Sequence, residues 1–145
     1  MARYPGNLLS DIELLKELAD ASDQISMDRY NSQDLQIETK PDATPVTDAD
    51  RSVEKKIREI LGRARMADLI VGEEFGSPES IPANTRYWII DPIDGTKNFL
   101  RGVPIWATLI GLAYRDENGN DSMVAGIVSA PALFRRWYAG RGFGA

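Results

Sequence analysis

The sequence contains no cysteine and no histidine. Without cysteine, the chain forms no disulfide, offers no thiol nucleophile and builds no cysteine-ligated zinc site. Without histidine it also lacks imidazole as a general base and as a metal ligand, which excludes the Ser-His-Asp and Cys-His arrangements. Any catalysis by this chain therefore depends on carboxylates, hydroxyls, backbone amides, Lys and Arg, or metal ions held by oxygen ligands.

Positive charge and long apolar runs are also scarce. The 17 Lys and Arg residues are outnumbered by 22 Asp and Glu residues, which gives a net charge of −5. This balance argues against nonspecific binding to nucleic acid or to a membrane surface. No apolar run reaches the roughly 18 residues of a spanning helix, and the first residues, MARYPGNLL, lack a signal-peptide core. We therefore expect a cytoplasmic protein without nucleic-acid or membrane partners.

The apolar patterning predicts an α+β fold. Residues 8–30 have helical periodicity, with Ser10 or Asp11 as N-cap, and a second helix begins at Thr47 or Asp48 and includes residues 53–61. Residues 40–45, which include two prolines, are predicted to be a loop. Predicted strands cover residues 35–39, 68–72, 86–90, 106–114, 123–129 and 136–139, and the Asn-Gly turn near residue 119 predicts a hairpin. We expect a sheet covered by helices on at least one side.

Acidic side chains gather where predicted helices begin and predicted strands end. The pairs are Asp48 with Asp50, Glu73 with Glu74, and Asp91 with Asp94. Ligand sites in layered folds form where such ends converge. Carboxylates without His or Cys favour a hard cation such as Mg²⁺ or Mn²⁺, and Mg²⁺ commonly shares its site with a substrate phosphate.

Each of these features also has an ordinary structural explanation. Asp48 or Asp50 alone caps a helix, a Glu-Glu pair is common in a solvated loop, and Asp-Pro-Ile-Asp-Gly is typical of a turn. Gly95-Thr96 adds a backbone that can approach an anion closely and a hydroxyl that can orient water. The occurrence of the three acidic pairs and Gly95-Thr96 together, and in this order, favours phosphoryl chemistry.

Three motifs, PVTDAD at 45–50, GEE at 72–74 and WIIDPIDGTKNF at 88–99, resemble the signature of the inositol monophosphatase superfamily. Its members are Mg²⁺-dependent, often lithium-sensitive phosphatases. The similarity extends over residues 8–145. Within the superfamily, the stretches ETKPDATPVTDAD and VSAPALFRRWYAGRGFGA look most like actinobacterial-type histidinol-phosphate phosphatases. The implied fold is a layered helix/sheet sandwich with a mixed, largely antiparallel sheet.

The resemblance implies a ligand set for two or three Mg²⁺ ions, with Mn²⁺ as a substitute. Glu73, Asp91 and the backbone carbonyl of Ile93 would hold the first ion. Asp91 would bridge to a second ion, held also by Asp94. A third, weaker ion would lie near Glu73.

The resemblance also implies catalytic and phosphate-binding roles. Asp50 would pair with the Thr96 hydroxyl, and Thr96 with Glu73 would orient the attacking water. The amides of Gly95 and Thr96, next to Asp94, would bind the substrate phosphate. Lys40 matches a lysine on a mobile loop that closes over the metals.

The implied reaction is hydrolysis of a small phosphomonoester by metal-activated water, with histidinol phosphate, an intermediate of histidine biosynthesis, as the expected substrate. Inositol 1-phosphate is the first alternative, and sugar bisphosphates or nucleotide 3′-phosphates are more distant ones. A second class of function is a catalytically incomplete fragment that binds metal or a partner chain.

Length is the departure from the family pattern. Family members are nearly twice as long as these 145 residues, which end on GRGFGA. We therefore expect residues 1–145 to be the N-terminal metal- and phosphate-binding portion of a phosphatase domain. The C-terminal half, which supplies another aspartate to the second metal and most substrate-selecting side chains, would be a partner of this chain. Because the family is commonly dimeric, a homodimer is also expected.

Overall fold

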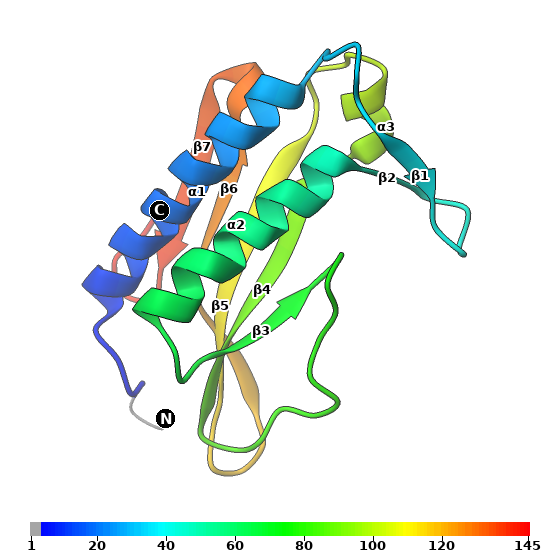
Figure 1. Cartoon of the computed structure of the whole chain (residues 1–145). Coiled ribbons are helices and arrows are strands. Elements are labelled where there is room, and N and C mark those ends of the chain that lie inside the picture. The colour runs from blue at the N-terminus through cyan, green and yellow to red at the C-terminus, as the bar shows by residue number, and fades with distance from the viewer. Residues whose placement is uncertain (1–3) are drawn as a thin grey trace.

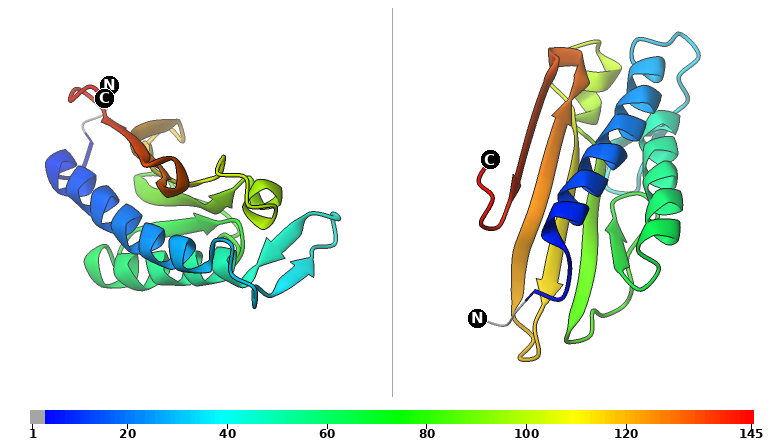
Figure 2. Two further views of the ribbon diagram at one scale, coloured as in Figure 1. Left: turned by 90° about the horizontal axis from the view of Figure 1, so that it is seen from above. Right: turned by 90° about the vertical axis from the view of Figure 1, so that its left-hand side faces the viewer.

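The computed structural model describes residues 4–145 and consists of two long helices packed on one face of a sheet (Figure 1). Helix α1 (Leu8–Arg29) and helix α2 (Asp48–Ala64) lie side by side in one layer, and the strands form the second layer (Figure 2). The predicted α+β class is confirmed. No helix in the described part of the chain is long and apolar enough to cross a membrane.

The main sheet has five strands in the order β3-β4-β5-β6-β7. Their bounds are β3 Leu69–Gly72, β4 Thr85–Asp94, β5 Ala107–Arg115, β6 Asp121–Ala130 and β7 Arg135–Gly140, with a 3₁₀ turn, η1, at Pro131–Leu133. Strand β3 is parallel to β4, and all later neighbours are antiparallel. The sheet is therefore mixed and largely antiparallel, as the resemblance implied, and β5 and β6 form the hairpin predicted from the Asn-Gly turn.

Three elements differ from the sequence-based expectation. Strand β1 (Ile37–Thr39) pairs with an unexpected strand, β2 (Pro45–Thr47), across the predicted loop. Proline is tolerated in β2 because a two-stranded ribbon consists only of edge strands. Strand β4 continues to Asp94 through a bulge between Asp91 and Asp94, and a short helix, α3 (Thr96–Leu100), follows where no helix was predicted.

The helix caps are partly as predicted. Thr47 caps α2 and forms a capping box with Asp50, which is one of the two predicted arrangements. Helix α1 begins at Leu8, as the periodicity predicted, but the predicted caps are wrong: Asn7 is the N-cap, and its side chain accepts a hydrogen bond from the amide of Ser10. The predicted cap Asp11 instead lies in the first turn and is buried.

The core lies between the helix layer and the sheet, and a smaller cluster supports the end of β4. The larger cluster joins both helices to the sheet and includes Leu15, Leu18, Val53, Ile57, Trp88 and Leu112, all fully buried. The smaller cluster contains Ala49, Ile93, Phe99 and Trp106, with Tyr30 packed against it. Trp88 and Trp106 are thus core residues, and the second cluster fixes α3 against the end of β4.

The opposite face of the sheet carries no covering element among residues 4–145 (Figure 2). Because side chains alternate along a strand, Trp88 and Ile90 point to the helices while Ile89 points to this bare face. Met123 and Trp137 are about half exposed, at 56% and 50%. A hollow of about 510 Å³, lined almost entirely by apolar side chains, lies on this face.

Candidate active site

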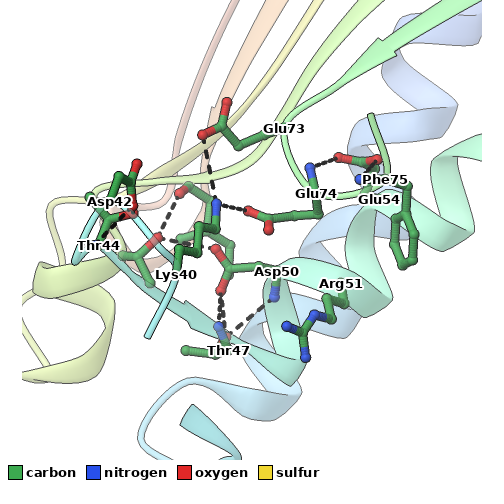
Figure 3. Close-up of polar contacts among 12 residues, drawn as sticks. Lys40, Asp42, Thr44, Thr47, Asp50, Arg51, Glu54, Glu73, Glu74 and Phe75 are labelled. Atoms are coloured by element: carbon green, nitrogen blue, oxygen red, sulfur yellow. Dashed lines mark hydrogen bonds and ion pairs between the residues drawn. The ribbon is translucent and has the colours of Figure 1, made fainter. Parts of the chain in front are cut away.

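The predicted site residues converge on one cleft of about 340 Å³. The cleft is bounded by the β1–β2 hairpin, the turn after β3, the end of β4 and the start of α3 (Figure 3). Its lining includes Lys40, Glu73, Glu74, Asp91, Ile93, Asp94, Gly95 and Thr96. Every predicted site residue except Asp50 lines the cleft, and Asp50 lies directly behind Thr96.

Asp50 is the buried anchor of the cleft. Its Oδ2 accepts hydrogen bonds from the Thr47 amide at 2.9 Å and the Thr47 hydroxyl at 2.5 Å. The Thr96 hydroxyl lies 3.1 Å from both Asp50 Oδ1 and the Ile93 carbonyl oxygen, and its single proton is shared between these two acceptors. Burial raises the pKa of Asp50, and the hydrogen bonds from Thr47 and Thr96 offset part of that effect. The Asp50–Thr96 contact implied by the resemblance is therefore present, and it fixes the position of the Thr96 hydroxyl.

The turn after β3 presents two glutamates with different surroundings. The Glu73 side chain is 60% exposed, whereas the Glu74 side chain is 5% exposed. Lys40 Nζ lies 3.0 Å from Glu74 Oε1 and 3.7 Å from Glu73 Oε1. Burial raises the pKa of Glu74, with partial compensation by Lys40. Burial alone would lower the pKa of Lys40, but the hydrogen bond and negative charge of Glu74, with Glu73, leave it raised. Lys40 therefore links the β1–β2 hairpin to the carboxylates.

Asp91 and Asp94 have no such compensation. Within residues 4–145, no hydrogen bond or ion pair reaches either carboxylate, and Lys40 is the only basic side chain paired with a carboxylate of the cleft. Burial, followed by the negative charges of Asp94, Glu73, Asp50 and Glu74, raises the pKa of Asp91 to about 7. The cleft thus holds an excess of negative charge at Asp91 that the described residues do not neutralise.

The donor set fits a hard divalent cation. Mg²⁺ usually takes one or two carboxylates and completes its shell with water and substrate oxygens. In the described part of the chain, no three acidic side chains are close enough to hold one ion together. The predicted ligand sets need only two carboxylates each, so this arrangement is compatible with them. The Ile93 carbonyl, which already accepts from Thr96, has a second lone pair available.

Gly95 gives the end of the motif its shape. It adopts a left-handed conformation, with φ of 86°, at the N-cap of α3. A Cβ at this position would lie 3.1 Å from the Ile105 carbonyl oxygen, so both the conformation and the space favour glycine. The first amides of a helix have no partner within it and are suited to an anion, which is compatible with the phosphate role predicted for Gly95 and Thr96.

One residue that supports the turn beside the cleft was not identified from the sequence. The Glu54 side chain is fully buried, and its carboxylate accepts hydrogen bonds from the backbone amides of Glu74 and Phe75 (Figure 3). The sequence signal was its place on the apolar face of α2, between Val53 and Ile57, where a charged residue requires a buried partner.

The fold is an α+β sandwich of the inositol monophosphatase type, and the chain belongs to the inositol monophosphatase family, whose pattern matches residues 8–145. This family is metal-dependent and acts on small phosphomonoesters. The chain is 55% identical over 135 residues to a histidinol-phosphatase of Mycobacterium tuberculosis, covering 93% of this chain and 49% of that protein. It is 54% identical to a histidinol-phosphatase of Streptomyces coelicolor, covering 94% of this chain and 50% of the relative.

Two further comparisons bear on the fold and the alternative substrate. An inositol-1-monophosphatase of Mesorhizobium japonicum is 36% identical, covering 86% of this chain and 45% of the relative. The crystal structure of the extragenic suppressor protein suhB from Bartonella henselae superposes with a TM-score of 0.81 at 31% identity, covering 93% of this chain and 50% of that one. The chain thus spans about half the length of the curated relatives it matches.

Proposed function

We propose that this chain is the metal- and phosphate-binding portion of a Mg²⁺-dependent phosphomonoesterase, with histidinol phosphate as substrate. The observation that carries the proposal is the uncompensated carboxylate pair Asp91 and Asp94 beside the Asp50–Thr96 contact in one cleft. The identity of 55% to a histidinol-phosphatase supports the substrate. The reaction transfers the phosphoryl group from the ester oxygen to water, which releases histidinol and inorganic phosphate.

In this proposal the metal ligands are those of the family pattern. Glu73, Asp91 and the Ile93 carbonyl hold one Mg²⁺, Asp91 and Asp94 hold a second, and a third weaker site lies near Glu73. When bound, these ions neutralise the phosphate oxygens and lower the pKa of the attacking water. Mn²⁺ has similar oxygen preferences and is the expected substitute.

The chain's own groups orient the reactants. The Thr96 hydroxyl, held by Asp50, positions the attacking water together with Glu73. The amides of Gly95 and Thr96 donate to the substrate phosphate. Lys40 brings the β1–β2 hairpin over the carboxylates, and its contacts with Glu73 and Glu74 support this placement.

The exposed apolar face of the sheet indicates that a further polypeptide segment covers it. Contiguous apolar surface of this kind marks an interaction site, and Asp91 lines both the cleft and the apolar hollow. We propose that this face is covered by a C-terminal remainder equivalent to the unmatched half of the relatives, and that it borders the active site at Asp91. The homodimer and the cytoplasmic location stay predictions.

The substrate is tested on this chain joined to its own C-terminal remainder, because a half taken from a relative would bring that relative's substrate-selecting side chains. Phosphate release is then measured with Mg²⁺ on L-histidinol phosphate and on inositol 1-phosphate. We expect a higher kcat/KM on histidinol phosphate. A higher kcat/KM on inositol 1-phosphate would select the alternative that the Mesorhizobium relative represents.

The chain alone distinguishes the second class of function. If the 145-residue chain alone releases no phosphate and the added half restores activity, the chain is one component of the enzyme. Turnover by the chain alone would contradict the need for a remainder. Metal or partner binding without turnover in the joined protein would favour the catalytically incomplete binding module.

A further inference from the structure

The turn 72–76 is held by a carboxylate from the neighbouring helix. Glu54, on α2, is fully buried, and its Oε1 accepts the Glu74 amide at 2.8 Å while its Oε2 accepts the Phe75 amide at 2.9 Å (Figure 3). Two consecutive amides bound by both oxygens of one carboxylate define the orientation of that peptide segment. The turn therefore has a rigid support that does not belong to the turn itself.

Arg58 completes this support, which we call the Glu54–Arg58 clamp. One turn further along α2, its Nε donates to Glu54 Oε2 at 2.9 Å, and its Nη2 donates to the Gly76 carbonyl at 2.6 Å. The guanidinium compensates the buried charge of Glu54 and holds the far end of the turn. The Glu54 carboxylate is thus satisfied by two amides and one guanidinium, and it needs no metal ion.

The other side of the turn is held by the sheet. The Glu73 amide donates to the Ile90 carbonyl of β4 at 3.1 Å, and the Gly72 amide donates to the Gly76 carbonyl at 3.0 Å. With β4 on one side and the clamp on the other, the turn directs the side chains of both Glu73 and Glu74 to the cleft, and Glu73 is the more exposed of the two (Figure 3). The backbone position of Glu73 is therefore set by its amide's hydrogen bond to β4 and by the clamp, and not by contacts of the Glu73 side chain within the cleft.

Gly72 provides independent evidence for the clamp. A Cβ added there would overlap Glu54 Oε2 and would lie 2.6 Å from Arg58 Nη2. Gly72 has no positive φ, so its backbone conformation does not require glycine. The requirement is space for the clamp, which explains the first residue of the GEE motif.

We infer that Glu54 is a positioning residue that fixes the turn 72–76 and thereby directs Glu73 toward Asp91 and the divalent cation. The inference rests on the proposed function for its metal, but the conformation of the turn is a property of the chain alone. Partners that orient a metal ligand without touching the metal typically contribute about 10- to 100-fold to metal affinity. A side chain that only stabilises the fold would not change that affinity in the folded protein.

The test compares Glu54→Gln with Glu59→Gln, a matched change at a half-exposed glutamate of the same helix. The neutral amide of Glu54→Gln places an NH₂ group against a donor and loses one acceptor. Amide hydrogen exchange, followed by NMR, is expected to accelerate at Glu74 and Phe75. Calorimetric titration of the joined protein with Mg²⁺ is expected to give about 10- to 100-fold weaker binding or none, with less than a twofold change in the control.

Gly72→Ala is the second variant, and it keeps the test valid if Glu54→Gln does not fold. Gly72→Ala displaces the Glu54 carboxylate without removing it. We therefore expect the same faster amide exchange at Glu74 and Phe75 and the same weaker Mg²⁺ binding. Wild-type exchange at Glu74 and Phe75, or wild-type Mg²⁺ affinity in a folded variant that has only a lower melting temperature, would overturn the inference. If the unmodified joined protein binds no Mg²⁺, the proposed metal site fails, and the exchange data alone then decide whether the clamp fixes the turn.

Discussion

The two ends of strand β4 place acidic side chains in opposite surroundings. At its start, Arg86 Nη2 lies 3.0 Å from Asp11 Oδ1 and 2.9 Å from Asp68 Oδ2. Arg65 also contacts Asp11, at 3.1 Å. At its end, Asp91 and Asp94 face Glu73 with no cation of the described chain in contact with either. We call the first group the balanced cluster and the second the carboxylate cleft.

The contrast separates acidic residues that stabilise the fold from those that the described chain leaves without a positive partner. Burying a charge is costly unless it is paired and hydrogen-bonded, and the balanced cluster meets that condition within the chain. Asp68 also accepts the indole N–H of Trp88, so it ties the charge pair to the core. In the carboxylate cleft, the half-buried Asp91 has acidic neighbours and no cation among the described residues, and a divalent cation would supply the missing positive charge.

The largest expected effect is on the cleft side of the comparison. In the joined protein, Asp91→Asn should reduce phosphate release from L-histidinol phosphate by about 10³-fold or more, since metal stabilisation of the transition state contributes several kcal/mol. The control is Asp121→Asn, which changes an exposed aspartate of β6. Near wild-type rates for Asp91→Asn at saturating Mg²⁺ would contradict the bridging assignment.

Substitutions in the balanced cluster should lower the stability of the fold. Asp11 is 1% exposed and bonds to Arg65, Arg86 and Tyr4. Asp11→Ala leaves buried positive charge without its partner, and we expect a loss of about 3–5 kcal/mol in the free energy of unfolding. Urea denaturation of the chain measures it.

The matched variants separate the two ends of β4. Asp20→Ala removes a surface ion pair with Arg136 and should cost no more than about 1 kcal/mol. In contrast, Asp91→Asn should not destabilise the metal-free chain, because it relieves repulsion from Asp94 and Glu73. A destabilisation by Asp91→Asn in EDTA as large as that by Asp11→Ala would remove the distinction between the clusters.

Much of the fold could be predicted because its signals are local. Helical periodicity identified α1 and α2, and the Asn-Gly turn identified the β5–β6 hairpin. Strand β2 was missed because its three residues include a proline and pair only with β1. Helix α3 was missed because five residues are too short to have a periodicity.

The site was predictable as a set of residues but not as an arrangement. The motifs named Glu73, Asp91 and Asp94, because their chemistry is visible in the sequence. The contacts that position them join residues far apart in the chain, such as Lys40 to Glu74 and Glu54 to Phe75. Such pairs follow from helix and strand packing: the sequence marks Glu54 as a charge on an apolar helix face, but it does not identify the partner.

The smallest expected effect concerns Lys40, the one basic residue that the described chain pairs with the cleft. Lys40→Gln removes a positive charge that repels the incoming cation, so Mg²⁺ should bind the chain about two- to tenfold more tightly in low salt. Lys56→Gln, at an exposed lysine of α2, should leave the affinity unchanged. Calorimetric titration of both variants measures the difference. A weaker affinity in Lys40→Gln would show instead that Lys40 is needed to arrange Glu73 and Glu74, and the cleft would then resemble the balanced cluster in using a cation of the chain itself.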